Sequence, residues 1–106
     1  STYNIRVGRS KTITGPYLDR AGVSMLDGGG TLVLQGNDVF HGPGHNAVLV
    51  EDGKHYLVYH AYDIKSNGTP LLHIEEIVWD DGWPQAPTQL LSAAHGLAHN
   101  AVHRHQ

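Results

Sequence analysis

The chain has 106 residues, a formal net charge of -3 and no cysteine, which is enough for one small domain. The acidic balance, with no Lys/Arg cluster to neutralise phosphates, excludes nucleic acid as a partner, and the lack of thiols excludes disulfides and thiolate metal sites. No apolar run approaches the roughly 20 residues of a transmembrane helix, so we expect no membrane partner.

The first third of the chain predicts short strands separated by turns. Apolar and polar side chains alternate over residues 3–7, which is the period of a strand. A Gly-Pro turn follows at residues 14–17, and a run of glycines at 28–30 separates it from a second strand at 31–35. The pattern predicts antiparallel neighbours rather than helices.

The region from residue 46 to residue 87 predicts a meander. Asp52-Gly53, placed between two runs of strand-forming residues, is a strong signal for a tight hairpin. A short outer strand is expected to begin at Trp83 and Pro84. The three longer strands are predicted at 46–51, 55–62 and 71–79. The Gly- and Pro-rich loop before them delivers His45 to the start of the first strand.

The tail, residues 88–106, is rich in Ala and His and lacks a strand pattern, so it is expected to be disordered or weakly helical. His95, His99 and His103 recur at every fourth position and would share one face of a helix, where they could bind a transition metal. Gly96 and the absence of a cap weaken such a helix, and an incidental tail is the favoured interpretation.

Five motifs, in this order and spacing, resemble glycoside hydrolase family 43, most of all its arabinan endo-1,5-α-L-arabinosidases. Together they cover residues 3 to 86. They are Arg9–Tyr17, Met25–Leu32, Gly42–Asn46, Tyr56–His60 and Trp79–Pro84.

The resemblance implies an all-β fold of antiparallel, four-stranded blades, cut from a five-bladed β-propeller. It places this chain in the C-terminal part of such an enzyme, covering about one and a half blades. Residues 1–38 are then expected to be outer strands of the penultimate blade, residues 39–87 the final blade, and residues 88–106 a tail.

The resemblance also implies hydrolysis of the O-glycosyl bonds of arabinan, or of a related plant polysaccharide, by inversion. The general base, the general acid and the pKa-modulating Asp of that family come from its first three blades, so we assign no catalytic residue here. Glu75 and Glu76 are adjacent on a strand and point to opposite faces, so they cannot act on one bond. The alternative is a non-catalytic carbohydrate-binding or self-assembling module derived from such an enzyme.

His45 is the candidate metal ligand. In the arabinanases that this chain resembles, the corresponding histidine points into the central channel and helps to hold a hydrated cation, taken as calcium. The alternative is a histidine that only forms hydrogen bonds in the hub. His41 is expected to be exposed in a loop, and His60 and His73 are expected to be packed within strands.

Substrate-binding residues are left unknown. Aromatic side chains could stack on sugar rings, but most are expected to fill the core. Tyr56 and Tyr62 should share one strand face, with Tyr59 on the other.

An isolated blade leaves apolar faces and strand edges open. We therefore expect a homo-oligomer in which two or three chains close a ring, with a carbohydrate as the other ligand class. By resemblance the protein is expected to be a secreted bacterial one, although the chain contains no signal-peptide pattern.

Overall fold

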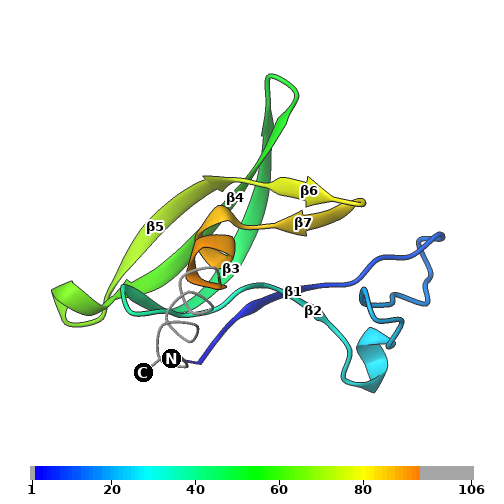
Figure 1. The fold of residues 1–106 in the computed structure, drawn as a ribbon, viewed down its shortest axis with the longest axis horizontal. Helices are drawn as coiled ribbons and strands as arrows, with labels where there is room; N and C mark the ends of the chain where they lie inside the picture. Colours follow the sequence, from blue (N-terminus) through cyan, green and yellow to red (C-terminus); the bar gives the residue numbers. More distant parts are fainter. Residues whose placement is uncertain (1, 94–106) are drawn as a thin grey trace, which may run out of the picture.

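The computed structural model describes residues 2–93, which form three small antiparallel sheets (Figure 1). The first sheet pairs β1 (Ile5–Val7) with β2 (Thr31–Leu34). Both strands lie within the ranges that the sequence predicts. The long connection between them contains a short 3₁₀ helix, η1 (Met25–Asp27), whose N-terminus is capped by the hydroxyl of Ser24.

The central sheet has the order β3-β4-β5, formed by β3 (Phe40–Glu51), β4 (Lys54–Asp63) and β5 (Thr69–Glu76). Asp52 and Gly53 connect the first two strands with φ angles of 52° and 76°. Two successive positive φ angles match the right-handed twist of the flanking strands, which is why Asp-Gly predicts this hairpin correctly. A second 3₁₀ helix, η2 (Ile64–Ser66), joins β4 to β5.

The predicted third strand of the meander is divided in two. Ile77 interrupts it, but its backbone N–H still donates to the carbonyl of His55 on β4 at 2.8 Å. Beyond this point β6 (Val78–Asp80) pairs with β7 (Trp83–Gln85), so the expected short outer strand is present. β5 and β6 follow one another along the chain and correspond to one predicted strand. Together with β3, β4 and β7 they give the four antiparallel strands of a blade.

The core lies between the β1–β2 sheet and one face of the central sheet. Leu34 of β2 is fully buried, and Tyr59 and Ala61 of β4 are each 1% exposed. Leu57 belongs to the same buried cluster. Because alternate residues of a strand point to opposite faces, the odd-numbered residues of β4 face this core and the even-numbered ones face away from it.

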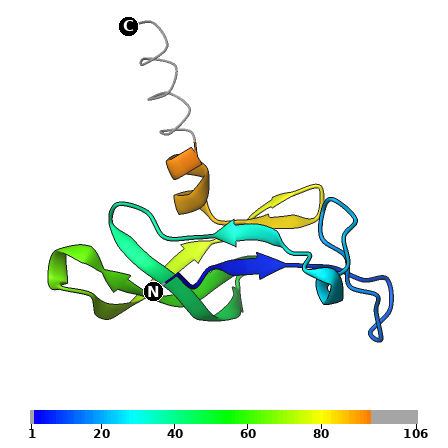
Figure 2. The same cartoon turned by 90° about the horizontal axis from the view of Figure 1, so that it is seen from below.

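One further expectation needs correction. The segment from Phe40 to His45, expected to be a loop, belongs to β3, although the pairing register shifts on both sides of Gly44. These bulges accommodate glycine and proline without ending the strand. The tail begins with helical structure over residues 87–93, in line with a weak helix (Figure 2). His95, His99 and His103 lie outside the described residues.

Within residues 2–93, no helix has the length and apolar character required to cross a bilayer.

Candidate functional site

His45 lies on β3 with a φ of 48°, in the left-handed region. Few residues other than glycine adopt this conformation, and His is among the side chains enriched there. The residue lies within the second register shift of β3, between Gly44 and Ala47, and its side chain is exposed. The backbone therefore turns this imidazole out of the normal alternation of the strand.

His60 of β4 is the neighbour of His45. The two imidazole rings have centroids 5.7 Å apart and are tilted by 56°. His60 is exposed, so the expectation that it is packed within the sheet is wrong; it lies on the even-numbered face of β4, which no second layer covers within residues 2–93. His41, opposite Tyr62 in the ladder, is exposed as predicted. Three histidines thus share one end of this sheet face.

These residues do not by themselves fit a calcium ion. Calcium takes six to eight oxygen ligands, commonly from carboxylates and carbonyls. Among residues 2–93, no three His, Cys, Asp or Glu side chains converge as a metal site, and the ring beside His45 is another imidazole. Within the described residues, His45 and His60 would present a cation with one or two imidazole nitrogens.

Glu75 and Glu76 lie on opposite faces of β5, as predicted. Glu76 is exposed and its Oε1 lies 3.9 Å from Nζ of Lys54. Glu75 faces the core side, where Oε2 accepts a 2.5 Å hydrogen bond from the hydroxyl of Tyr59 and Oε1 accepts a 2.8 Å bond from the backbone N–H of Thr88. Both oxygens of Glu75 are therefore engaged in holding the structure together.

Tyr59 and His73 form a stacked pair under the sheet. Their rings are 5.1 Å apart and nearly parallel, at 9°, and Phe40 packs against both. Burial, followed by the hydrogen bond to Glu75, raises the pKa of Tyr59 far above its ordinary value. His73 is partly buried as expected, but its Nε2 has no hydrogen-bond partner within the described part of the chain.

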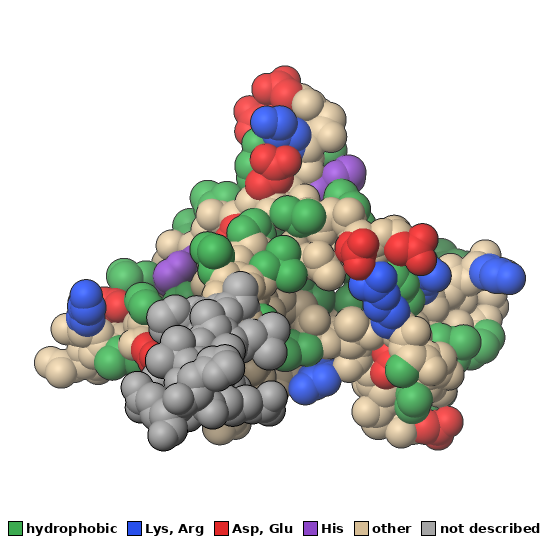
Figure 3. Space-filling model, viewed as in Figure 1, with side chains coloured by type: hydrophobic (Ala, Val, Ile, Leu, Met, Phe, Trp, Pro, Cys, Tyr) green, Lys and Arg blue, Asp and Glu red, His purple; other side chains and the backbone are tan. Residues whose placement is uncertain are grey.

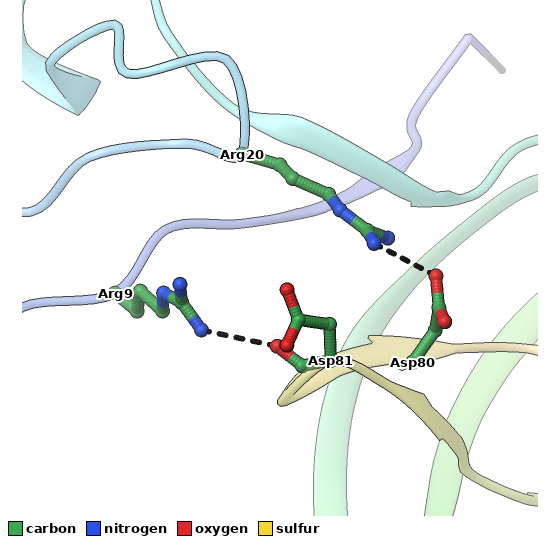
Figure 4. Close-up of polar contacts among 4 residues, drawn as sticks. All are labelled: Arg9, Arg20, Asp80 and Asp81. Carbon is green, nitrogen blue, oxygen red and sulfur yellow. Dashed lines mark hydrogen bonds and ion pairs between the residues drawn. The ribbon is translucent and has the colours of Figure 1, made fainter.

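Two arginines join the N-terminal region to the β6–β7 turn (Figure 4). Arg20 contacts Asp80 at 2.7 Å, and Nη1 of Arg9 donates to the backbone carbonyl of Asp81 at 3.3 Å. The Arg9 guanidinium also stacks 4.4 Å from the ring centre of Trp83. These contacts fix the N-terminal region against the β6–β7 hairpin.

A hollow of about 550 Å³ lies beside this junction. Cationic side chains from Arg9, Lys11 and Arg20 line it, and Asp19 is the carboxylate in its wall. The Asp19 carboxylate accepts hydrogen bonds from the backbone N–H groups of its own loop and of Gly30. It is thereby held as a structural acceptor, which also lowers its pKa.

The aromatic side chains are divided as the strand alternation predicts. Tyr59 is buried on the core face, whereas Tyr56 and Tyr62 lie on the other face. Trp83 is 4% exposed under Arg9 and is not available for stacking on a sugar; Trp79 is 49% exposed.

The network of Tyr59, Glu75 and Thr88 was missed by sequence reasoning. The signal was present in the predicted hairpin, because the ladder pairs Leu57 with Glu75 and Tyr59 with His73. Tyr59 and Glu75 are therefore diagonal neighbours on one face, which is within reach of a long side chain.

Comparison with known proteins places these features in a family. The family model of glycosyl hydrolases family 43 matches residues 1–84. The chain is 52% identical over 84 residues to the extracellular endo-α-(1→5)-L-arabinanase 1 of Bacillus subtilis, covering 79% of this chain and 25% of the relative. It is 48% identical over 94 residues to the extracellular exo-α-(1→5)-L-arabinofuranosidase ArbA of Cellvibrio japonicus, covering 88% and 27%.

A solved α-L-arabinanase from Cellvibrio cellulosa superposes with a TM-score of 0.80 at 48% identity, over 88% of this chain and 30% of that one. The chain thus spans between a quarter and a third of the length of these relatives. The solved arabinanases are five-bladed β-propellers, and the antiparallel sheets of this chain superpose on part of that architecture. The chain belongs to glycosyl hydrolases family 43.

Proposed function

We propose that this chain is the C-terminal part of an arabinan-hydrolysing enzyme and supplies one wall of its substrate site. The observation that carries the proposal is the 52% identity to a Bacillus subtilis endo-arabinanase, which extends over 84 residues. The superposition on a solved arabinanase supports it independently. A non-catalytic binding module is not favoured, because the relatives matched here are named as hydrolases.

The chain's contribution is positional. Inversion requires an acid and a base about 6.5–9.5 Å apart on either side of the scissile bond. Glu75 and Glu76 face away from each other across β5, and Glu75 is held by Tyr59 and Thr88. The catalytic carboxylates are therefore assigned to the remainder of the enzyme, while β3 presents His45 and its neighbours to the site.

A chimera tests this proposal. The matching quarter of the Bacillus subtilis relative is replaced by residues 1–84 of this chain, and hydrolysis of linear arabinan is measured. We expect a folded, active chimera, and His45→Ala in the same chimera should lower kcat/KM. A chimera that folds, as judged by circular dichroism, but does not hydrolyse arabinan contradicts the proposal.

The chain alone provides the complementary test. It should not hydrolyse arabinan, because no acid–base pair is assigned to it. If activity appeared, Glu75→Ala, Glu76→Ala and Asp63→Ala would show which carboxylate carried it. Activity abolished by one of these variants would overturn the assignment of catalysis to the rest of the enzyme.

We further propose endo action. The identity to the endo-acting relative is 52%, against 48% to the exo-acting one, which supports this choice. In a second chimera, residues 1–84 replace the matching part of the exo-acting Cellvibrio japonicus relative, and we expect a mixture of arabino-oligosaccharides early in the reaction. A single short product from the first time points would assign exo action instead.

Two remaining expectations belong to the complete enzyme. His45 is proposed as one ligand of a hydrated cation whose other ligands are waters and groups outside this chain. Secretion is proposed because the Bacillus subtilis and Cellvibrio japonicus relatives are described as extracellular.

A further inference from the structure

The turn between β4 and β5 carries an asparagine followed by a glycine, at Asn67 and Gly68. It is the one Asn-Gly pair in the sequence; the other asparagines each precede a larger residue, at Asn4, Asn37, Asn46 and Asn100. Asn67 and Gly68 are exposed, and their turn forms the left-hand end of the molecule in Figure 1, an end that projects from the body in the space-filling view (Figure 3). The pair is therefore accessible to water.

An asparagine followed by glycine can react with its own backbone. The nitrogen of Gly68 gives up its proton to solvent and attacks Cγ of Asn67, and a C–N bond forms between them. The side-chain amide takes up a proton and leaves as ammonia. Water then opens the succinimide ring at either of its two carbonyls, which gives aspartate or isoaspartate. Glycine favours this reaction because it has no Cβ beside the attacking nitrogen and leaves the backbone free to rotate.

The backbone of the folded turn holds the two reacting atoms apart. Asn67 ends η2 in the left-handed region, with a φ of 55° and a ψ of 37°. Because of the tetrahedral geometry at Cα, this ψ places the nitrogen of Gly68 nearly opposite Cβ of Asn67 when viewed along the Cα–C bond. Ring closure needs the nitrogen on the same side as Cβ. The ψ angle of Asn67 must therefore rotate far from its native value before the reaction can occur.

Hydrogen bonds keep the turn in this conformation. The N–H of Gly68, the attacking nitrogen, donates to the carbonyl of Asp63 at 2.8 Å. Oγ1 of Thr69 donates to the carbonyl of Ser66 at 2.6 Å, and Thr69 is paired with Asp63 in the ladder. Packing adds little, since a Cβ on Gly68 would meet no atom of residues 2–93 within 4 Å. The hydrogen bonds thus close the turn, and their loss frees the ψ angle of Asn67.

We propose that Asn67 is the deamidation site of this chain and that the closed β4–β5 turn protects it. Reaction proceeds through the local opening of the turn, a kind of motion that is separate from global unfolding. Each event adds one negative charge to a chain of net charge -3, in the same turn as Asp63. Isoaspartate also lengthens the backbone of the turn, so the closed conformation is not recovered. The modification therefore reports the opening of this end of the sheet.

Peptide mapping by mass spectrometry tests the proposal on the intact chain, incubated in mildly alkaline buffer with and without guanidinium chloride. In denaturant, Asn67 should deamidate faster than every other asparagine. In native buffer its rate should be about tenfold lower or less, because only the open fraction of the turn reacts. Equal rates at Asn67 in the two buffers, or a faster reaction at another asparagine in denaturant, would overturn the proposal.

A pair of matched variants separates the turn from the rest of the fold. Thr69→Val and Thr12→Val each remove a hydroxyl that donates to a turn carbonyl, that of Ser66 at 2.6 Å and that of Gly15 at 2.8 Å. Thr69→Val should raise the native rate at Asn67 about fivefold, the factor that corresponds to one hydrogen bond of ordinary strength. Its rate in denaturant should stay unchanged, and Thr12→Val, in a different turn, should alter neither rate.

Circular dichroism of both variants confirms that the fold is retained. A native rate that does not respond to Thr69→Val, or that rises equally in Thr12→Val, would show that the β4–β5 turn is not what protects Asn67. No readout involves arabinan, so failure here is distinct from failure of the proposed function.

Discussion

The hydroxyl of Tyr59 and the carboxylate of Glu75 are joined by a 2.5 Å hydrogen bond between β4 and β5. The same carboxylate accepts the backbone N–H of Thr88, at the start of the helical residues 87–93. A helix leaves its first N–H groups without partners in the helix, and an acidic side chain there is favourable. Glu75 therefore links a buried phenol to the segment that follows the last strand.

Tyr59→Phe should destabilise the fold by about 1–2 kcal/mol, because it removes a hydrogen bond to a charged acceptor while keeping the ring. Urea unfolding measures this change. Tyr62→Phe is the control, since Tyr62 is 42% exposed, and its effect should stay under about 0.5 kcal/mol. Equal losses in the two variants would contradict a specific role for the Tyr59 bond.

Tyr59 should also make stability fall at alkaline pH. Burial and Glu75 raise the pKa of Tyr59 in the folded state, so the unfolded chain loses the phenolic proton first. The contribution is complete below the unfolded pKa of about 10 and is lost as pH rises from there toward the folded pKa. Tyr59→Phe should therefore show a shallower loss of unfolding free energy above pH 10 than the parent chain; a parallel curve would argue against it.

Asp19 should contribute stability that disappears in acid. Its carboxylate accepts backbone N–H bonds, first from Gly30 and then from Val23, which lowers its pKa below the ordinary 3.8. The contribution is present above the unfolded pKa and is lost as pH falls through the folded one. Asp19→Ala should flatten the acid limb of stability below about pH 4, and Asp27→Ala serves as a nearby control. An unchanged acid limb in Asp19→Ala would contradict this role.

The two arginines that contact the β6–β7 turn should contribute unequally to the free energy of unfolding. Arg20 forms an exposed ion pair with Asp80, and such pairs contribute about 0–1 kcal/mol. Arg9 covers Trp83, so Arg9→Ala removes both a cation–π contact and apolar cover. We expect Arg9→Ala to lower the unfolding free energy more than Arg20→Ala, and Arg20→Ala alone to lose its effect in 1 M salt. The reverse order would show that the ion pair dominates the junction.

Calcium should not stabilise the isolated chain. His45 and His60 offer imidazole nitrogens rather than the oxygen ligands that calcium prefers. The melting temperature should therefore be the same in calcium and in EDTA. A rise of several degrees in calcium, abolished by His45→Ala, would mean that this chain holds the ion without further blades.

The sequence alone determined most of the strands and their order. Alternating side chains at 3–7 and the Asp52-Gly53 turn indicated β1 and the β3–β4 hairpin, because strand periodicity and turn chemistry are local properties. Local pattern also placed Glu75 and Glu76 on opposite faces. It failed at residues 40–45, where bulges allow a Gly- and Pro-containing segment to remain in a strand.

Tertiary structure decided which face of each strand is covered. Periodicity shows that β4 has two faces, but the packing of Leu34 and Ile5 against one of them buries Tyr59 and leaves His60 exposed. Three contacts join residues distant in sequence. The rings of His45 and His60 lie beside each other, Glu75 accepts a hydrogen bond from Thr88, and Arg9 stacks on Trp83. Such contacts depend on register and on the placement of whole sheets, which no local pattern specifies.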